Sequence, residues 1–319
     1  AGLTGINVKI AASDVMSVVD AEKLKTDYSI GTVEATLTPG KISAFVSDGG
    51  TPLTTTGNKF HITVEGTANA EVFTGTDIDD LLDVLGKTTG DITLKATDAG
   101  GDPSVVGTLT KVASIFANPQ IKNEVASNVT INDVAGSVLQ ASKLKELNAD
   151  TTGNVSVGAT AYTVSGNIDD LTSIYAAANT AANANAGTNG IHGLGNEAVI
   201  VTDLKVDAAK LKAFSSHDGA GNTSPETDST ITVISQTING THDNVAAVID
   251  GFAGTAAHTG QADINIEIDS GTATFSQVKV LNTKSTGTVK ATITGTETLA
   301  TAKTQLEAAG RVNDLTITV

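Results

Sequence analysis

The sequence has no cysteine and no tryptophan, and aromatic residues make up only 3% of its 319 residues. Without cysteine the chain carries neither disulfides nor thiolate-bound metals, and thiol nucleophiles are excluded. The scarcity of aromatics argues against a polysaccharide-active enzyme, which normally combines clustered carboxylates with aromatic side chains that stack on sugars. Because no other catalytic constellation stands out, we expect that the protein is not an enzyme.

Basic residues are also in deficit, with 19 Lys and Arg against 35 Asp and Glu and a formal net charge of -16. This charge repels phosphate backbones, so we expect no nucleic-acid partner. No apolar run approaches the roughly 18 residues that a membrane-spanning helix requires, so we also expect no membrane insertion. The sequence opens at Ala1 without a Met, which predicts a processed form or a fragment.

Internal repetition is what the sequence has in abundance. Residues 285–306 are typical of a strand followed, across a Gly-Thr turn, by an amphipathic helix. The strand half, GTVKATIT at 287–294, is matched almost letter for letter by GTVEATLT at 31–38. Apolar residues alternate in both octets, and a period of two indicates a strand with one buried face. The same alternation predicts strands at 6–10, 60–64, 128–131, 198–206, 230–238, 264–268 and 315–319.

A second repeat is helical. The pentapeptide AEKLK at 21–25 recurs as ASKLK at 141–145 and as AAKLK at 208–212. Its Ala and Leu, three positions apart, share one face of a helix while the lysines point to water. Four further helices are expected to begin after a glycine, with the next residue as N-cap. These N-cap residues are Thr76, Asn167, Thr241 and Thr296.

A third recurring element is a turn that leads into a strand. The tripeptides TTG at 88–90 and 151–153 and STG at 285–287 each precede an alternating apolar segment. We expect the glycine of each tripeptide to adopt a positive φ, which glycine tolerates better than other residues.

The alternation of short strands with helices of about ten residues predicts right-handed crossovers and parallel strand pairing. Repeated along one axis, this gives an α/β repeat solenoid in which parallel strands alternate with short helices. The alternative is a β-roll or β-solenoid with few helices. Because no clear internal boundary interrupts the pattern, residues 1–319 are expected to form a single elongated repeat array.

The first and last strands are the expected sites of self-association. Neither contains the Pro or bulge that commonly protects an exposed strand edge. We therefore expect the chain to associate with copies of itself, head to tail or laterally. The residues of this prediction are Ile6, Val8, Ile10, Leu315, Ile317 and Val319.

Calcium is the one cofactor that the sequence suggests. Asp98 and Asp102 flank a pair of glycines and Asp48 precedes another pair, and flexible Gly-Asp turns can wrap a hard cation. Turn-forming Asp without a metal is the alternative. The acidic run from Asp77 to Asp83 is interpreted as the start of a helix, because carboxylates are favoured in a first helical turn.

Two stretches resemble a known family. The segment TTGNVSVGATAYTVSGNIDDLTSIYAAA at 151–178, together with GIHGLGNEAVIV at 190–201, resembles the degenerate repeats of very large exported surface proteins of marine cyanobacteria and some proteobacteria. Such repeats are often found beside calcium-binding nonapeptide modules of the repeats-in-toxin type, although the nonapeptide itself is absent here. The resemblance implies an extracellular or cell-surface structural or adhesive role, with no catalytic residues to carry over.

Composition, repetition and this resemblance together predict a structural subunit or segment of a bacterial surface layer, sheath, filament or giant adhesin. The alternative is a fibre-type binding module that recognises glycans, such as those of a cell surface, or cations. Its binding loops would be residues 98–102 and 215–229, the second of which is rich in Gly, Asn and Ser.

Overall fold

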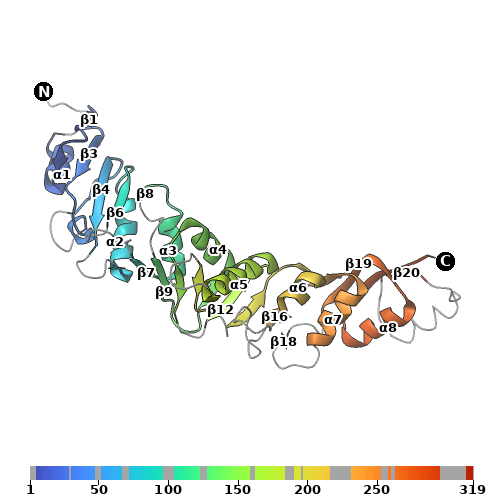
Figure 1. Ribbon diagram of the computed structural model, residues 1–319. Helices are drawn as coiled ribbons and strands as arrows, with labels where there is room; N and C mark the ends of the chain where they lie inside the picture. Colours follow the sequence, from blue (N-terminus) through green and yellow to red (C-terminus); the bar gives the residue numbers. More distant parts are fainter. Residues whose placement is uncertain are drawn as a thin grey trace. The chain divides into compact units, whose positions relative to one another are not determined.

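The computed structural model has an α/β fold of parallel strands and helices (Figure 1). It describes residues 5–28, 30–46, 52–66, 72–95, 104–122, 128–158, 162–183, 190–194, 197–215, 231–252, 258–259, 263–294 and 314–318. Every strand pair within these ranges is parallel, and the four sheets are open. Parallel pairing is confirmed. The eight helices of the described ranges favour the α/β prediction over the alternative with few helices.

The chain divides into two compact units that interleave along the sequence. Unit 1 comprises Ala1–Val134, Glu146–Ala159 and Ala184–Gly193. Unit 2 comprises Ala135–Lys145, Thr160–Asn183 and Leu194–Val319. The chain therefore passes from one unit to the other more than once. A single repeat array over residues 1–319 stays a prediction.

Unit 1 contains two parallel sheets. Sheet 1 has the order β1 (Val8–Lys9), β3 (Val33–Leu37), β4 (Lys59–Glu65), β6 (Ile92–Lys95) and β8 (Ile121–Lys122), and β2 (Val15–Met16) also pairs with β3. Sheet 2 has the order β13 (Ile191–His192), β11 (Val155–Val157), β9 (Asn128–Ile131), β7 (Ser104–Gly107) and β5 (Val72–Phe73). Helix α1 (Val18–Tyr28) packs on β3, whereas α2 (Gly75–Leu85) and α3 (Leu109–Phe116) pack on sheet 2. A short 3-10 helix, η1 (Ile42–Ala44), contacts α2.

Unit 2 contains the other two sheets. Sheet 3 has the order β10 (Val138–Gln140), β12 (Thr163–Gly166), β14 (Ala198–Val201), β16 (Ile231–Val233) and β18 (His258–Thr259). Sheet 4 has the order β15 (Lys205–Asp207), β17 (Thr237–Gly240), β19 (Asn265–Ala273), β20 (Val289–Thr294) and β21 (Asp314–Thr318). Helix α5 (Ile168–Asn183) packs on β12, and α6 (Ala208–Ser215), α7 (His242–Phe252) and α8 (Phe275–Lys284) lie in a row along sheet 4 (Figure 1). Helix α4 (Ala141–Asp150) has residues in both units.

The two matching octets form the strands that their alternation predicts. In β3 the side chains of Val33, Ala35 and Leu37 are buried, and the residues between them are half-buried. The equivalent β20 likewise buries its alternate apolar residues. The helix that the sequence predicts after β20 lies outside the described residues.

Small residues let the helices approach the neighbouring strands closely. The first residue of the helical repeat is fully buried in all three copies, at Ala21, Ala141 and Ala208. A Cβ atom added to Gly166, at the end of β12, would lie only 2.6 Å from the Cβ of Ala141. Alanine and glycine thus allow close packing where these helices meet the strands.

The turn glycines differ from the prediction. Within the described ranges, the glycines with a positive φ do not include Gly90, Gly153 or Gly287. What excludes larger residues at two of these positions is proximity, because an added Cβ would lie 2.2 Å from Phe60 O at Gly90 and 2.2 Å from Ile264 O at Gly287. The first hydroxyl of each tripeptide accepts a hydrogen bond from the glycine N–H, at 3.0 to 3.1 Å.

The helix starts are partly as predicted. Asn167 and Thr241 accept hydrogen bonds from the N–H groups three residues on, so these N-caps are confirmed. At α2 the prediction of Thr76 is wrong, because Thr74 is the N-cap and forms a capping box with Asp77. Thr296 lies outside the described residues.

Some strand predictions have the wrong extent. The segments 198–206 and 230–238 were each expected as one strand, yet each forms two strands in different sheets, β14 and β15 in the first and β16 and β17 in the second. The buried apolar positions change phase at the corner, from Val199 and Val201 to Val206 in the first segment and from Ile231 and Val233 to Ile238 in the second, so a strict period of two breaks where the chain bends.

Candidate functional site

The predicted calcium ligands Asp48, Asp98 and Asp102 lie outside the described residues. Within the part of the chain that the structure describes, no group of three or more His, Asp or Glu side chains is placed to hold a metal ion. Calcium binding by these aspartates therefore stays a prediction.

The acidic residues of α2 are engaged in hydrogen bonds and ion pairs. Asp77 accepts hydrogen bonds from both the N–H and the hydroxyl of Thr74. Asp79 forms an ion pair with Lys111 of α3, with 2.6 Å between Nζ and Oδ1. Asp77 therefore confirms the interpretation of this run as a helix start.

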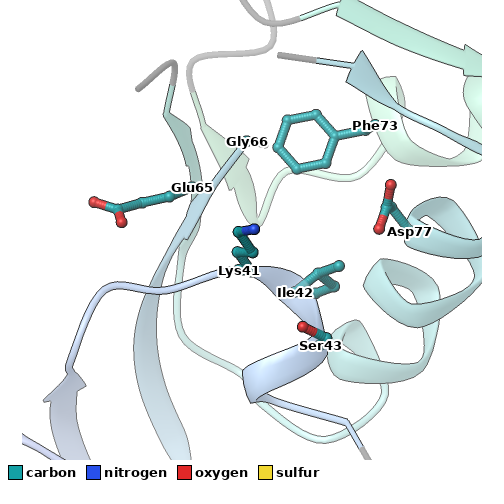
Figure 2. A pocket seen from close by; sticks show the side chains of 7 residues that line it. All are labelled: Lys41, Ile42, Ser43, Glu65, Gly66, Phe73 and Asp77. Carbon is teal, nitrogen blue, oxygen red and sulfur yellow. The ribbon is translucent and has the colours of Figure 1, made fainter. Parts of the chain in front are cut away.

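A small pocket opens between η1, β4 and α2 in unit 1. Figure 2 shows the seven residues that line it, Lys41, Ile42, Ser43, Glu65, Gly66, Phe73 and Asp77. Its volume is about 90 Å³, against the roughly 300 to 1,000 Å³ of typical small-molecule sites. The Glu65 carboxylate points away from the pocket, and the Asp77 carboxylate already caps α2 (Figure 2). This pocket is too small for a sugar or a nucleotide.

The edge strand β1 presents a lysine. Val8 and Ile10 donate their N–H groups to Thr32 O and Glu34 O at 2.8 and 2.9 Å. Successive residues of a strand direct their backbone groups to opposite sides, so the N–H and C=O of Lys9 are directed away from β3. Such outward groups on an edge strand form a template for another strand.

Side chains of alternating charge cross sheet 1 from this edge. Lys9 donates to Glu34 Oε1 at 2.9 Å, and Lys59 donates to the same oxygen at 3.4 Å. The hydrogen bond from Lys9, reinforced by the charge of Lys59, holds the pKa of Glu34 below its ordinary value. The order of charges from the edge inward is positive, negative, positive.

A similar row of alternating charges crosses sheet 4. It ends at the edge strand β21 with a negative residue, Asp314, whereas the row of sheet 1 ends with a positive one. Glu267 lies 2.7 Å from Lys205 and 2.9 Å from Lys290, and the register places Asp314 beside Lys290. Hydrogen bonding to Glu267, together with the charge of Asp314, raises the pKa of Lys290. From the edge inward, Asp314, Lys290 and Glu267 alternate as negative, positive, negative.

The structure places the residues predicted for self-association at these two edges. Val8 and Ile10 are half-buried beside β3, and Ile6, just before β1, is 46% exposed. Leu315 is half-buried, and Leu315 and Ile317 pair with Ala291 and Ile293 of β20. Val319 lies outside the described residues.

Sequence reasoning missed the charged residues at the two edges, Lys9 and Asp314. One signal was available, because the matching octets differ in charge at a single equivalent position, Glu34 in one and Lys290 in the other. Because opposite charges on paired strands stabilise a sheet, this difference indicates neighbours of opposite charge for the two residues.

A scan against protein-family models finds no match for this chain, and searches of curated proteins and of solved structures also find none. None of the helices that the structure describes has the length and apolar character needed to cross a membrane.

Proposed function

We propose that this protein is an extracellular structural protein, a self-associating subunit or segment of a bacterial surface layer, sheath, filament or giant adhesin. The observation that carries the proposal is that all four described sheets are open and built of parallel strands from different parts of the chain. In such an architecture, a further repeat or a further copy adds one more parallel strand to an existing edge. The protein would then function through the length of its assemblies and the cohesion between their subunits.

In this proposal the chain is an α/β repeat solenoid. The spacing of equivalent contacts supports this interpretation. Lys9 and Glu34 are 25 residues apart, as are Glu34 and Lys59, and Glu267 and Lys290 are 23 apart. Paired residues of all the strand pairs lie between 20 and 36 positions apart, so the turns vary in length, as degenerate repeats with loops of unequal length would.

Electron microscopy of the purified chain at a series of concentrations tests the proposal. We expect filaments or sheets with an axial repeat that grow more abundant as the concentration rises. Compact particles of a single size at every concentration would refute a self-associating structural role.

The same series with and without millimolar calcium tests the aspartates of the predicted calcium turns. Assembly that requires calcium would support binding by Asp48, Asp98 and Asp102, and substitution of all three by Asn should then abolish the requirement. Assembly that is equal in both conditions would argue against a calcium role.

The alternative function, a binding module for glycans or cations, depends on loops 98–102 and 215–229. Apart from Ser215 these loops lie outside the described residues, so no observed contact favours this alternative.

A further inference from the structure

We infer that β21 of one copy pairs with β1 of a second copy, in the register that sets Asp314 opposite Lys9. This inference rests on the proposed self-association and specifies its partner, its polarity and its register. The contact joins two different surfaces, so it is heterologous and generates open filaments or rings.

Charge complementarity is the first reason for this pairing. Asp314 is exposed on β21, and the side chain of Lys9 on β1 is 73% exposed. Lys290 lies between Glu267 and Asp314, and Glu34 lies between Lys9 and another lysine. Joining the two edges continues the alternation of signs across the junction, because Asp314 then lies between two lysines and Lys9 between two carboxylates.

The register is the second reason. With Asp314 opposite Lys9, Leu315 stands opposite Ile10, and both side chains lie on the same face because side chains alternate along a strand. Both residues are only half-buried within one copy, so the junction covers apolar surface while the charges stay at the solvent side. A shift by one residue would set an apolar side chain against a charged one.

The opposite pairings are disfavoured by the same charges. Two β1 edges would bring Lys9 against Lys9, and two β21 edges would bring Asp314 against Asp314, and like charges directly opposite one another destabilise a strand pair. Each copy also carries a formal charge of -16, so association requires a specific local attraction that offsets the general repulsion. The edges therefore select head-to-tail contacts between copies.

Charge reversal tests the junction. Lys9→Glu and Asp314→Lys should each weaken association at least about tenfold in sedimentation velocity at 150 mM salt, since each places like charges opposite one another. An equimolar mixture of the two variants should recover association, because the carboxylate introduced on β1 of one variant then meets the ammonium group introduced on β21 of the other. Recovery on mixing is the decisive result, because neither an unfolded variant nor a general charge effect produces it.

Two variants control for the change in net charge. Lys23→Glu alters an exposed residue of α1, and Asp243→Lys alters a side chain of α7 that is 92% exposed. Both should associate as the natural chain does. Circular dichroism of all variants should show the same folded spectrum.

The outcomes separate this inference from the proposed function. If the natural chain stays monomeric at every concentration, both are wrong. If it assembles and the two edge variants assemble equally well, the junction is elsewhere and only this inference is wrong. If both edge variants fail and their mixture also fails, the direct pairing of Lys9 with Asp314 is refuted.

Discussion

Lys145 of α4 and Asp170 of α5 form an ion pair in unit 2, with 2.7 Å between Nζ and Oδ1. Asp170 also completes the N-terminal cap of α5, because its N–H donates to Asn167 Oδ1 while Asn167 Nδ2 donates to its carboxylate. The hydrogen bond from Lys145, opposed by partial burial and assisted by Asn167, holds the pKa of Asp170 below its ordinary value. The Asp170 carboxylate thus links α4 to α5 and takes part in the N-terminal cap of α5.

We predict that Asp170→Asn lowers the free energy of unfolding by about 1 kcal/mol at pH 7. A lowered carboxyl pKa contributes stability above the unfolded pKa of about 3.9, and this contribution is lost as the pH falls through the folded pKa. The difference between variant and natural chain should therefore shrink below about pH 4, as measured by urea denaturation at several pH values.

The neighbouring Asp169→Asn is the matched control. Its ion pair with Lys210 is exposed, with 66% of the Asp169 side chain accessible, so the change should cost less than about 0.5 kcal/mol. A penalty for Asp170→Asn that is the same at pH 7 and pH 2.5 would show that its charge is not the cause.

Gly90→Ala should destabilise the chain by about 2 kcal/mol or more, because the new Cβ meets the Phe60 carbonyl and the strands cannot separate without losing pairing. Gly75→Ala is the control, since an added Cβ there has nothing within 4 Å. That change should be neutral or stabilising by up to about 1 kcal/mol. Equal midpoints of urea denaturation for the two variants would contradict the close-approach explanation.

Thr88→Val should cost about 2 kcal/mol or more. The buried Thr88 hydroxyl accepts hydrogen bonds from Phe60 N and Gly90 N, and valine leaves both N–H groups without this acceptor. Thr89→Val loses one hydrogen bond from an exposed residue to Asn58 O, so it should cost less than about 1 kcal/mol. Thermal unfolding followed by circular dichroism compares the pair, and the reverse order of stability would contradict the assigned role of Thr88.

Tyr175 should ionise only at strongly alkaline pH. Burial first, and then the adjacent Glu197 carboxylate, raises its pKa well above the ordinary value. The folded chain holds this proton more tightly than the unfolded chain, so its contribution to stability is lost as the pH rises above about 10.

Absorbance at 295 nm during an alkaline titration should show a late ionisation that disappears in Tyr175→Phe. Tyr28→Phe removes the hydroxyl of a residue that is 58% exposed and should retain the late step. A titration of Tyr175→Phe in which the late step persists would show that another group produces it.

The alternation of apolar residues predicts a strand correctly where the alternating segment forms only one strand. The range 128–131 coincides with β9, because Val129 and Ile131 are buried and the residues beside them are not. Helix α3 was missed, although Leu109, Val112 and Ile115 are spaced three apart and all three are buried. The segment is short, but it carries the same start signal as the other helices, because Gly107 directly precedes the N-cap Thr108.

Contacts between residues that are distant in the sequence could not be predicted from it. The Lys9–Glu34 pair and the Phe60–Thr88 hydrogen bonds join residues 25 and 28 apart, and loops of unequal length conceal which residues become neighbours. The turn glycines show the same limit. Their recurrence was visible, but the reason for it at Gly90 and Gly287 is the close approach of Phe60 O and Ile264 O, which are distant in the sequence.

The interleaving of the two units constrains how the gene can change. The chain enters unit 2 at Ala135, returns to unit 1 at Glu146, and makes its last passage to unit 2 at Leu194. No single crossover within residues 135–193 would transfer one unit intact to another protein, since every such cut divides both units. Domain shuffling must carry this stretch as one block, whereas duplication outside it can lengthen either unit.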